Sequence, residues 1–298
     1  KAAAFAATEI YDLRISAGRF FDHGRRFSKK EQFVSFMCFG ISFGTIFGLL
    51  TGNQALGMSM GMCVGVCIGT LLDAQKKKNV KLKAIVFDFD YTLGDGTEEI
   101  VISMNYALRK MGYPERTTEE IRKTIGLIVE EALEMFEGIT DPKEQKQFVE
   151  YFVEKINQIV STHTELYPDT KNVLKALKEK DYKIAIVSTK HDNQLKAILE
   201  KFQIIDLVDM IVGSNNVTTP KPAPDGIHKV LQEMNLKKEE ILYVGDSVVD
   251  AKTAENAGVQ FAAVTTGTTT KEELEQYQNV CIAQNLEGIY GYILSKEK

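Results

Sequence analysis

K-A-I-V-F-D-F-D-Y-T-L occupies residues 83–93, where an apolar run leads into two aspartates. The four residues Ala84–Phe87 have the length and composition of a buried strand in a parallel sheet. Because residues i and i+2 of a strand point to the same side, Asp88 and Asp90 are expected to leave the sheet together. Two carboxylates at the carboxyl end of a strand repel each other unless a cation or a proton intervenes. The stretch predicts metal-assisted chemistry, although taken alone it also fits an ordinary solvated turn.

Charge is distributed unevenly along the 298 residues. Residues 1–83 carry 12 Lys or Arg and 5 Asp or Glu, whereas the remainder carries 24 and 36. A basic first part and an acidic second part suggest two pieces with different surroundings. The acidic part argues against a nucleic-acid partner, since phosphate backbones need basic surfaces. The four cysteines show neither a disulfide framework nor metal-ligand spacing, which favours a reducing compartment.

A long uncharged stretch runs from Phe33 to Leu72. The turn-forming sequence T-G-N-Q at Thr51–Gln54 divides it into two runs, each near the lower length limit for crossing a bilayer. We therefore expect a transmembrane helical hairpin over 33–74. Basic residues precede it and follow it in a lysine-rich linker, 75–82, which places both ends in the cytoplasm.

Glycines recur every four residues in both runs, at positions 40, 44, 48 and 52 and at positions 57, 61, 65 and 69. Residues four apart share a helix face, so each helix presents a groove where another backbone can lie close. The pattern resembles glycine-zipper membrane segments and suggests a homo-oligomer formed through these helices. A buried hairpin of a water-soluble protein is the alternative. Residues 1–32 are expected to be a tail, either lying on a membrane surface or poorly ordered.

Beyond the linker, the sequence predicts an α/β core interrupted by helices. Apolar residues recur at helical spacing over 97–164, directly after the first strand, which predicts a helical cap. Later helices alternate with four predicted strands, at Tyr182–Ser188, Met210–Gly213, Ile241–Gly245 and Phe261–Val264. Such alternation produces right-handed βαβ units and a parallel sheet. We therefore predict a Rossmann-like core formed by 83–96 and 165–298.

Several of these strands end in groups suited to phosphoryl transfer: Ser188 and Thr189, then Lys221, then Asp246, Ser247 and Asp250. A phosphoryl group needs hydrogen bonds and positive charge around it while an oxygen attacks in line. Each residue also has a plainer interpretation, as a helix cap, a first-turn carboxylate or a solvated lysine. Their succession after the D-x-D strand favours the phosphoryl-transfer interpretation.

The combination resembles the haloacid dehalogenase superfamily, and within it the phosphoglycolate phosphatase-like group with a helical cap. The four motifs of that superfamily have matches in D-x-D-x-T at 88–92, Ser188, Lys221 within K-P-A-P, and G-D-S-x-x-D at 245–250. The resemblance covers residues 83–298 and leaves residues 1–80 uncovered.

This resemblance implies a Mg²⁺-dependent phosphomonoester hydrolase that acts on a small phosphorylated metabolite through an aspartyl-phosphate. Asp88 would be the nucleophile, while Asp90 would protonate the leaving oxygen and then activate water. Mg²⁺ would be bound by Asp88, Asp90 and Asp246, with support from Asp250 and Ser247. The phosphoryl oxygens would be bound by Thr92, Ser188, Thr189 and Lys221.

Three features depart from the family pattern. Tyr91 stands where relatives usually have Gly, which puts a bulky ring beside the nucleophile. Thr189 replaces a frequent Asn, and Y-P-D-T at 167–170 replaces Tyr-Pro-Gly-Val. The substrate depends on the cap, whose basic residues are either anion contacts or ordinary surface charges: Arg109, Arg116, Arg122 and Lys123.

The leading hypothesis is a phosphatase tethered at the cytoplasmic face of a bacterial membrane. A sugar-phosphate mutase and a pyrophosphatase on the same scaffold are enzymatic alternatives. A mutase would pass the phosphoryl group to a second substrate hydroxyl rather than to water. The alternative from another class is a membrane scaffold with an inactive phosphatase-like domain, which Tyr91 favours and the intact motif residues oppose.

Overall fold

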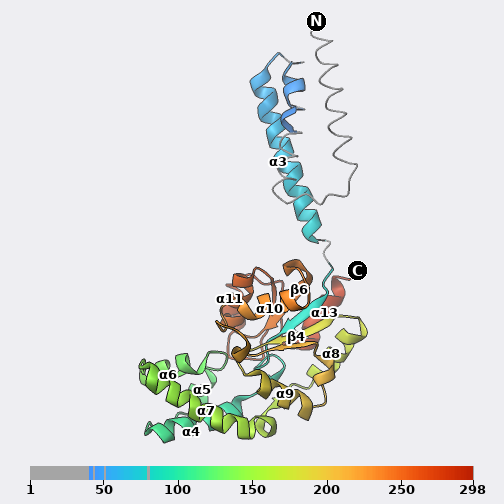
Figure 1. The fold of residues 1–298 in the computed structure, drawn as a ribbon. Coiled ribbons are helices and arrows are strands. Elements are labelled where there is room, and N and C mark those ends of the chain that lie inside the picture. Colours follow the sequence, from blue (N-terminus) through green and yellow to red (C-terminus); the bar gives the residue numbers. More distant parts are fainter. Residues whose placement is uncertain (1–39, 43, 50–51, 79–80, 298) are drawn as a thin grey trace. The chain divides into compact units, whose positions relative to one another are not determined.

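The computed structural model describes residues 40–42, 44–49, 52–78 and 81–297, which Figure 1 shows in colour. The chain divides into two compact units, one ending at residue 79 and the other starting at residue 80. The tail expected over 1–32 lies outside the described residues. Part of the expected linker is helical, because α3 (Gln54–Lys78) continues through its first four residues.

The first unit contains helical residues at 40–42 and 44–49 and the long helix α3. Glycines of the two helices lie against each other. A Cβ atom on Gly61 would collide with the carbonyl oxygen of Gly40 and lie 2.8 Å from the Gly44 Cα. The two glycine faces therefore pack on each other within the chain, which uses the close approach that the four-residue spacing allows. The homo-oligomer expected through these faces has no support, because the glycines at 40, 44, 48, 57 and 61 already contact one another within the chain.

Across the described residues, none of the helices combines enough length and apolar character to cross a membrane. The transmembrane hairpin expected over 33–74 is therefore not supported. Half of its first run, Phe33–Leu50, lies outside the described residues, as do most side chains in the second half of α3. A location at the cytoplasmic face of a membrane stays a prediction from the sequence.

The second unit is built on a six-stranded parallel sheet with the order β5-β4-β1-β6-β7-β8. The strands are β1 (Ala84–Phe87), β4 (Lys183–Val187), β5 (Met210–Val212), β6 (Ile241–Gly245), β7 (Gln260–Val264) and β8 (Cys281–Ala283). Phe87 at the end of β1 lies opposite Ile186 of β4 and Val244 of β6. The residues that follow β1 are therefore flanked by the carboxyl ends of two neighbouring strands. The predicted parallel α/β sheet is confirmed.

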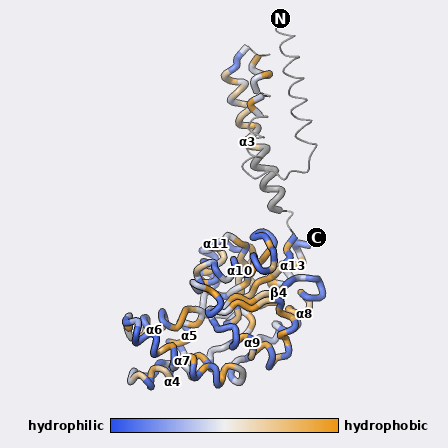
Figure 2. Tube along the Cα trace, viewed as in Figure 1, coloured by the Kyte–Doolittle hydropathy of each residue, from blue (hydrophilic) through white to orange (hydrophobic). Residues whose placement is uncertain are grey.

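Helices cover both faces of this sheet (Figure 1). They are α8 (Thr170–Glu179), α9 (Asp192–Lys201), α10 (Asp225–Glu233), α11 (Val248–Ala257) and α13 (Leu286–Ser295). Ile85 and Phe87 belong to a core shared with α8, α9 and α13, whereas Ala84 and Val86 belong to a second core shared with α10 and α11. Because β1 is buried on both faces, its sequence is apolar throughout rather than alternating. Figure 2 shows the strands as the apolar centre of this unit.

Short helical turns connect the larger elements of the second unit, at η1 (Ile205–Leu207), η2 (Ser214–Asn216), η3 (Lys238–Glu240) and α12 (Lys271–Leu274).

A helical cap follows β1, as the sequence pattern suggests. Its helices are α4 (Thr97–Met111), α5 (Thr118–Arg122), α6 (Val129–Glu137) and α7 (Pro142–His163). The chain enters and leaves this cap through β2 (Gly94–Asp95) and β3 (Glu165–Leu166), which pair antiparallel. This two-stranded connection joins the cap to the core directly after the β1 aspartates.

Replacement of Gly57 by Leu is expected to separate the two helices of the first unit. Any side chain at Gly57 collides with the backbones of Gly44 and Gly48. Limited proteolysis of the full chain should then cut residues 40–78 several times faster than in the wild type. Ser59→Leu, at an exposed position of the same helix, serves as the control and should leave the rate unchanged. Equal cleavage of Gly57→Leu and wild type would contradict the packing.

Candidate active site

Asp88 lies at the end of β1 within a cluster of buried charged groups. Its amide donates a hydrogen bond of 2.8 Å to the carbonyl oxygen of Val244, which extends the ladder between β1 and β6. Its Oδ1 atom is 2.9 Å from Nζ of Lys221, and that ammonium is also 2.7 Å from Oδ1 of Asp250. Both carboxylates and the ammonium are almost completely buried. Lys221 therefore holds together two carboxylates from distant parts of the chain, Asp88 after β1 and Asp250 in α11.

Asp246, directly after β6, completes a set of three carboxylates. Oxygen atoms of Asp88, Asp246 and Asp250 all lie within 4.8 Å of one another. Thr92 Oγ1 donates a hydrogen bond of 3.2 Å to Asp246 Oδ1. A side chain at Gly267 would collide with the Asp246 carboxylate, so only glycine leaves room for that carboxylate there. The structure thus brings three of the four predicted carboxylates together at one edge of the sheet, and the Asp90 carboxylate lies outside this set.

Burial and mutual repulsion shift the acidity of this cluster. Desolvation raises the pKa of Asp88 to about 7, even though Lys221 lowers it, and the charge of Asp250 adds to the rise. Burial, followed by the charges of Asp250 and Asp88, holds the pKa of Asp246 well above its usual range. Burial is the largest influence on Asp250 and acts to raise its pKa, but the charge of Lys221 and the hydrogen bonds from Lys221, Ser247 and Tyr243 together lower the pKa of that carboxyl.

The donor set fits a divalent cation. Three carboxylates share the cluster with a single ammonium, so the buried groups retain excess negative charge when ionised. Carboxylate oxygens are the ligands that Mg²⁺ prefers in proteins. Asp250 is the least available of the three carboxylates for binding a cation, because it already accepts hydrogen bonds from Lys221, Tyr243 and Ser247. Asp88 and Asp246 are therefore the carboxylates best placed to bind the ion.

The hydroxyl groups predicted to bind phosphate take different positions. Ser188 follows β4, is buried, and accepts a hydrogen bond of 3.3 Å from the Lys190 amide. Thr189 is half-buried, and Thr92 is fully buried with its hydroxyl on Asp246. Ser247, which was predicted to support the metal site rather than to bind phosphate, caps α11 and donates a 2.6 Å hydrogen bond to Asp250.

A second buried ion pair lies beside Asp90, and the sequence patterns did not reveal it. Lys190 Nζ is 3.4 Å from Asp90 Oδ2 and 2.9 Å from Glu99 Oε1. Burial opposes the charge on Lys190, but Asp90 and Glu99 outweigh it and raise the pKa of the lysine. Glu99 also accepts a hydrogen bond from Thr164. The missed signal was a lysine directly after Ser188-Thr189, at the same strand end as the predicted hydroxyls.

Glu99 and Thr164 lie at the two connections of the cap. Glu99 is in the first turn of α4, and Thr164 directly follows α7. Because Lys190 binds Glu99 and Asp90 together, one buried cation joins the proposed acid–base residue to both ends of the cap. Gly96 contributes space, since a Cβ atom there would collide with Asp90 Oδ1.

Tyr91 has an unusual backbone and contacts the cap. Its φ angle of 60° lies in the left-handed region, where glycine is favoured, which explains why the sequence pattern of relatives has Gly here. The hydroxyl lies 2.7 Å from Thr97 Oγ1 and 3.4 Å from Arg122 Nε, and the Arg122 guanidinium lies over the ring. Tyr91 therefore connects the nucleophile loop to the cap.

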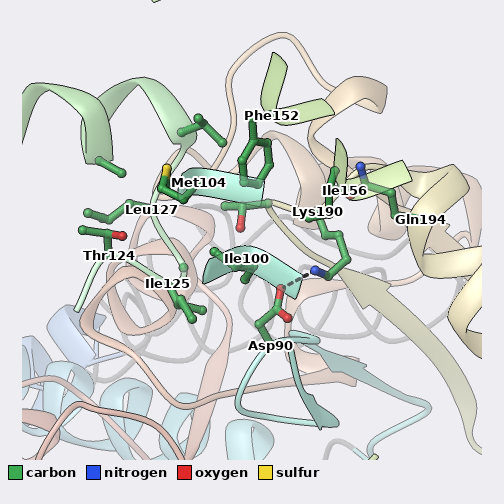
Figure 3. A pocket seen from close by; sticks show the side chains of 14 residues that line it. Asp90, Ile100, Met104, Thr124, Ile125, Leu127, Phe152, Ile156, Lys190 and Gln194 are labelled. Carbon is green, nitrogen blue, oxygen red and sulfur yellow. Dashed lines mark ion pairs between the residues drawn. The ribbon is translucent and has the colours of Figure 1, made fainter. Parts of the chain in front are cut away.

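A cavity lies between Asp90 and the cap (Figure 3). It holds about 460 Å³ of empty space, part of which is open to solvent. Asp90 and Lys190 mark one side, joined by the ion pair drawn in Figure 3, and apolar cap side chains surround the rest. Tyr91 is not among the described residues that line it, so its ring does not narrow this cavity.

The comparisons with known proteins concern the second unit. A model of the family described as haloacid dehalogenase-like hydrolase matches residues 85–264. A phosphoglycolate phosphatase of Aquifex aeolicus is 30% identical over 181 residues, or 61% of this chain and 84% of that protein. A haloacid dehalogenase-like hydrolase structure from Bacteroides fragilis aligns with a TM-score of 0.68 and 36% identity, over 70% of this chain and 100% of that one. A predicted phosphoglycolate phosphatase structure from Haemophilus somnus aligns with a TM-score of 0.63 and 26% identity, over 73% and 98%.

Lys190→Met is expected to destabilise the second unit by about 3–5 kcal/mol, because it leaves Glu99 buried without its cation. Urea denaturation measures the loss, and adding Glu99→Gln should restore part of it, since the two residues are directly coupled. Lys196→Met is the matched control. Its lysine is 53% exposed and pairs with Asp192, so the change should cost about 0–1 kcal/mol. A loss below about 1 kcal/mol for Lys190→Met would show that the pair carries little stability.

The stability of the metal-free protein should fall as pH rises from about 4 to 7. Asp88 has a pKa of about 7 when folded, above its usual value of 3.8, so the folded state binds the proton more tightly. The stabilisation that comes from proton binding is lost as the pH rises and Asp88 loses its proton. The pKa of Asp246 is also raised in the folded protein, so Asp246 contributes a loss of stability in the same direction. Denaturation of the EDTA-treated protein at pH 5 and pH 8 measures the change. Mg²⁺ should stabilise the protein more at pH 8, and Asp88→Asn should flatten the pH dependence.

Proposed function

Because the chain belongs to the haloacid dehalogenase-like hydrolases, we propose that it hydrolyses phosphate monoesters of small metabolites. The carrying observation is the position of Asp88, 2.9 Å from the Lys221 ammonium and within 4.8 Å of the Asp246 and Asp250 carboxylates. Two of the similar proteins bear the name phosphoglycolate phosphatase, which supports a phosphate ester as the substrate.

Asp88 is the proposed nucleophile. One of its carboxylate oxygens attacks phosphorus as the bond from phosphorus to the leaving oxygen breaks, which gives an aspartyl-phosphate and an alcohol. Lys221 places a positive charge beside the attacking carboxylate and is itself fixed by Asp250. Since Lys221 is held from two sides, its charge needs no rearrangement when negative charge builds up on the phosphoryl oxygens.

Asp90 is the proposed acid and base. It gives a proton to the leaving oxygen in the first step and takes one from water in the second, as water attacks phosphorus and releases Asp88. Its Oδ1 atom is buried without a hydrogen-bond partner among the described residues, while Lys190 holds Oδ2. One oxygen is therefore left to exchange protons with the reacting groups.

Mg²⁺ is the proposed cofactor, with Asp88 and Asp246 as carboxylate ligands and Asp250 as their support. When bound, it neutralises the crowded carboxylates and the phosphoryl oxygens. The Asp90 carbonyl as a further ligand, and Ser188, Thr189 and Thr92 as phosphate contacts, belong to the same proposal. The cytoplasmic face of a membrane stays the predicted location.

Asp88→Asn should reduce phosphate release from p-nitrophenyl phosphate to the background rate, because the amide is a poor nucleophile. The release is measured by p-nitrophenol absorbance at saturating Mg²⁺. Asp206→Asn, an exposed change in η1, is the matched control and should keep wild-type activity. Wild-type turnover by Asp88→Asn would exclude Asp88 as the nucleophile.

A further inference from the structure

The cavity beside Asp90 has an apolar side and a polar side. Its cap side is formed largely by apolar side chains of α4, the connection between α5 and α6, and α7. These include Ile100, Met104, Ile125, Leu127, Phe152 and Ile156. In Figure 3, Met104, Leu127 and Phe152 lie across the space from the Asp90–Lys190 pair, whereas Ile100 and Ile156 lie close to it. Small-molecule sites are commonly of this kind, with an apolar wall and a few polar groups that fix orientation.

Two polar residues of the lining, Thr124 and Gln194, are already engaged within the protein. Thr124 Oγ1 donates a hydrogen bond of 2.8 Å to the carbonyl oxygen of Ile121. Gln194 donates to Asn157 and accepts from the His191 amide. These groups therefore offer little to a charged or strongly polar ligand.

Lys190 is the single cationic side chain among the described residues that line the cavity. It is bound to both Asp90 and Glu99, so the polar side of the cavity carries no surplus positive charge. A carboxylate placed there would lie near two acidic side chains and would lose its water without gaining a cation.

The basic residues of the cap do not compensate. Arg109 pairs with Glu115, Arg116 lies near Glu120 and the Phe136 ring, and Arg122 lies over Tyr91. Lys123 is exposed. None of the four lines the cavity, so their role as anion contacts, left open by the sequence, has no support from its lining.

We propose that this cavity receives an uncharged, apolar leaving group, so that the preferred substrates are phosphate monoesters of alcohols with a compact hydrocarbon skeleton. The inference rests on the proposed phosphatase function, because Asp90 must protonate the leaving oxygen and that oxygen must therefore lie beside it. The group attached to the oxygen then extends into the space lined by the cap. A phosphate ester with an anionic leaving group, such as phosphoglycolate, fits this lining poorly.

The test compares benzyl phosphate with phosphoglycolate on the 298-residue chain at saturating Mg²⁺. Both are monoesters of primary alcohols, so they differ mainly in the apolar or anionic nature of the leaving group. The expected kcat/KM for benzyl phosphate is at least tenfold higher, the size of effect that an apolar pocket gives. A smaller preference, or a preference for phosphoglycolate, overturns the inference.

A charge reversal of the pocket supplies an independent test. Leu127→Lys places an unpaired cation in the half-exposed part of the lining and should shift the ratio toward phosphoglycolate by at least tenfold. Met135→Lys is the matched control, because Met135 is 64% exposed on α6 and does not line the cavity. It should leave the ratio unchanged. An unaltered ratio in Leu127→Lys, with p-nitrophenyl phosphate still hydrolysed, places the leaving group elsewhere and overturns the inference.

Hydrolysis of p-nitrophenyl phosphate by the wild type distinguishes failure of the apolar pocket from failure of the phosphatase function. Activity on this substrate combined with a preference for phosphoglycolate rejects the apolar pocket and keeps the phosphatase. Complete inactivity on every ester, with Mg²⁺ present, rejects the phosphatase and the pocket together.

Discussion

Lys221 stabilises the cluster of buried carboxylates at the end of β1. Three carboxylates lie within 4.8 Å of one another in a buried space, and without a cation such a group would repel itself or hold protons. The Lys221 ammonium touches two of them, at 2.9 Å and 2.7 Å. One ammonium cannot neutralise three carboxylates, so the cluster keeps an attraction for a further cation. The same imbalance that costs stability in the metal-free protein thus creates the affinity that phosphoryl chemistry needs.

Lys190 repeats this arrangement on the other side of the nucleophile loop. It joins Asp90 to Glu99, and Glu99 in turn binds Thr164 on the second connection of the cap. The lysine that pairs with Asp90 is therefore also linked to both connections of the cap. Tyr91 adds another contact between the nucleophile loop and the cap. Its backbone belongs to the loop, and its hydroxyl lies within hydrogen-bond distance of Thr97 and Arg122 in the cap.

Sequence reasoning located the groups that follow strands but missed those that act across the cap. Asp88, Lys221, Asp246 and Asp250 could be predicted because a period of two and the edge of a parallel sheet place strand-end residues together. Glu99 could not, because a single acidic residue on an amphipathic helix ordinarily faces solvent. Its partner Lys190 is nearly a hundred residues away, beyond the reach of local patterns.

Other differences between the sequence-based predictions and the structure also have physical reasons. Strand β8 has only three half-buried residues, too few for a periodic signal. Tyr91 looked like an obstacle because its ring direction depends on a left-handed backbone that the sequence does not reveal. The glycine spacing correctly indicated close helix packing, but the partner helix belongs to the same chain.

The apolar wall of the cavity bears on the order of the two proposed chemical steps. Transfer of the phosphoryl group to Asp88 needs Asp90 protonated beside the leaving oxygen, whereas release of phosphate needs water in the same place. An apolar leaving group that fills the space between Asp90 and the cap excludes water while it remains there. Water can reach Asp90 only after the alcohol departs, by which time Asp90 has given up its proton and can act as a base. The lining thus favours a strict succession of transfer and hydrolysis.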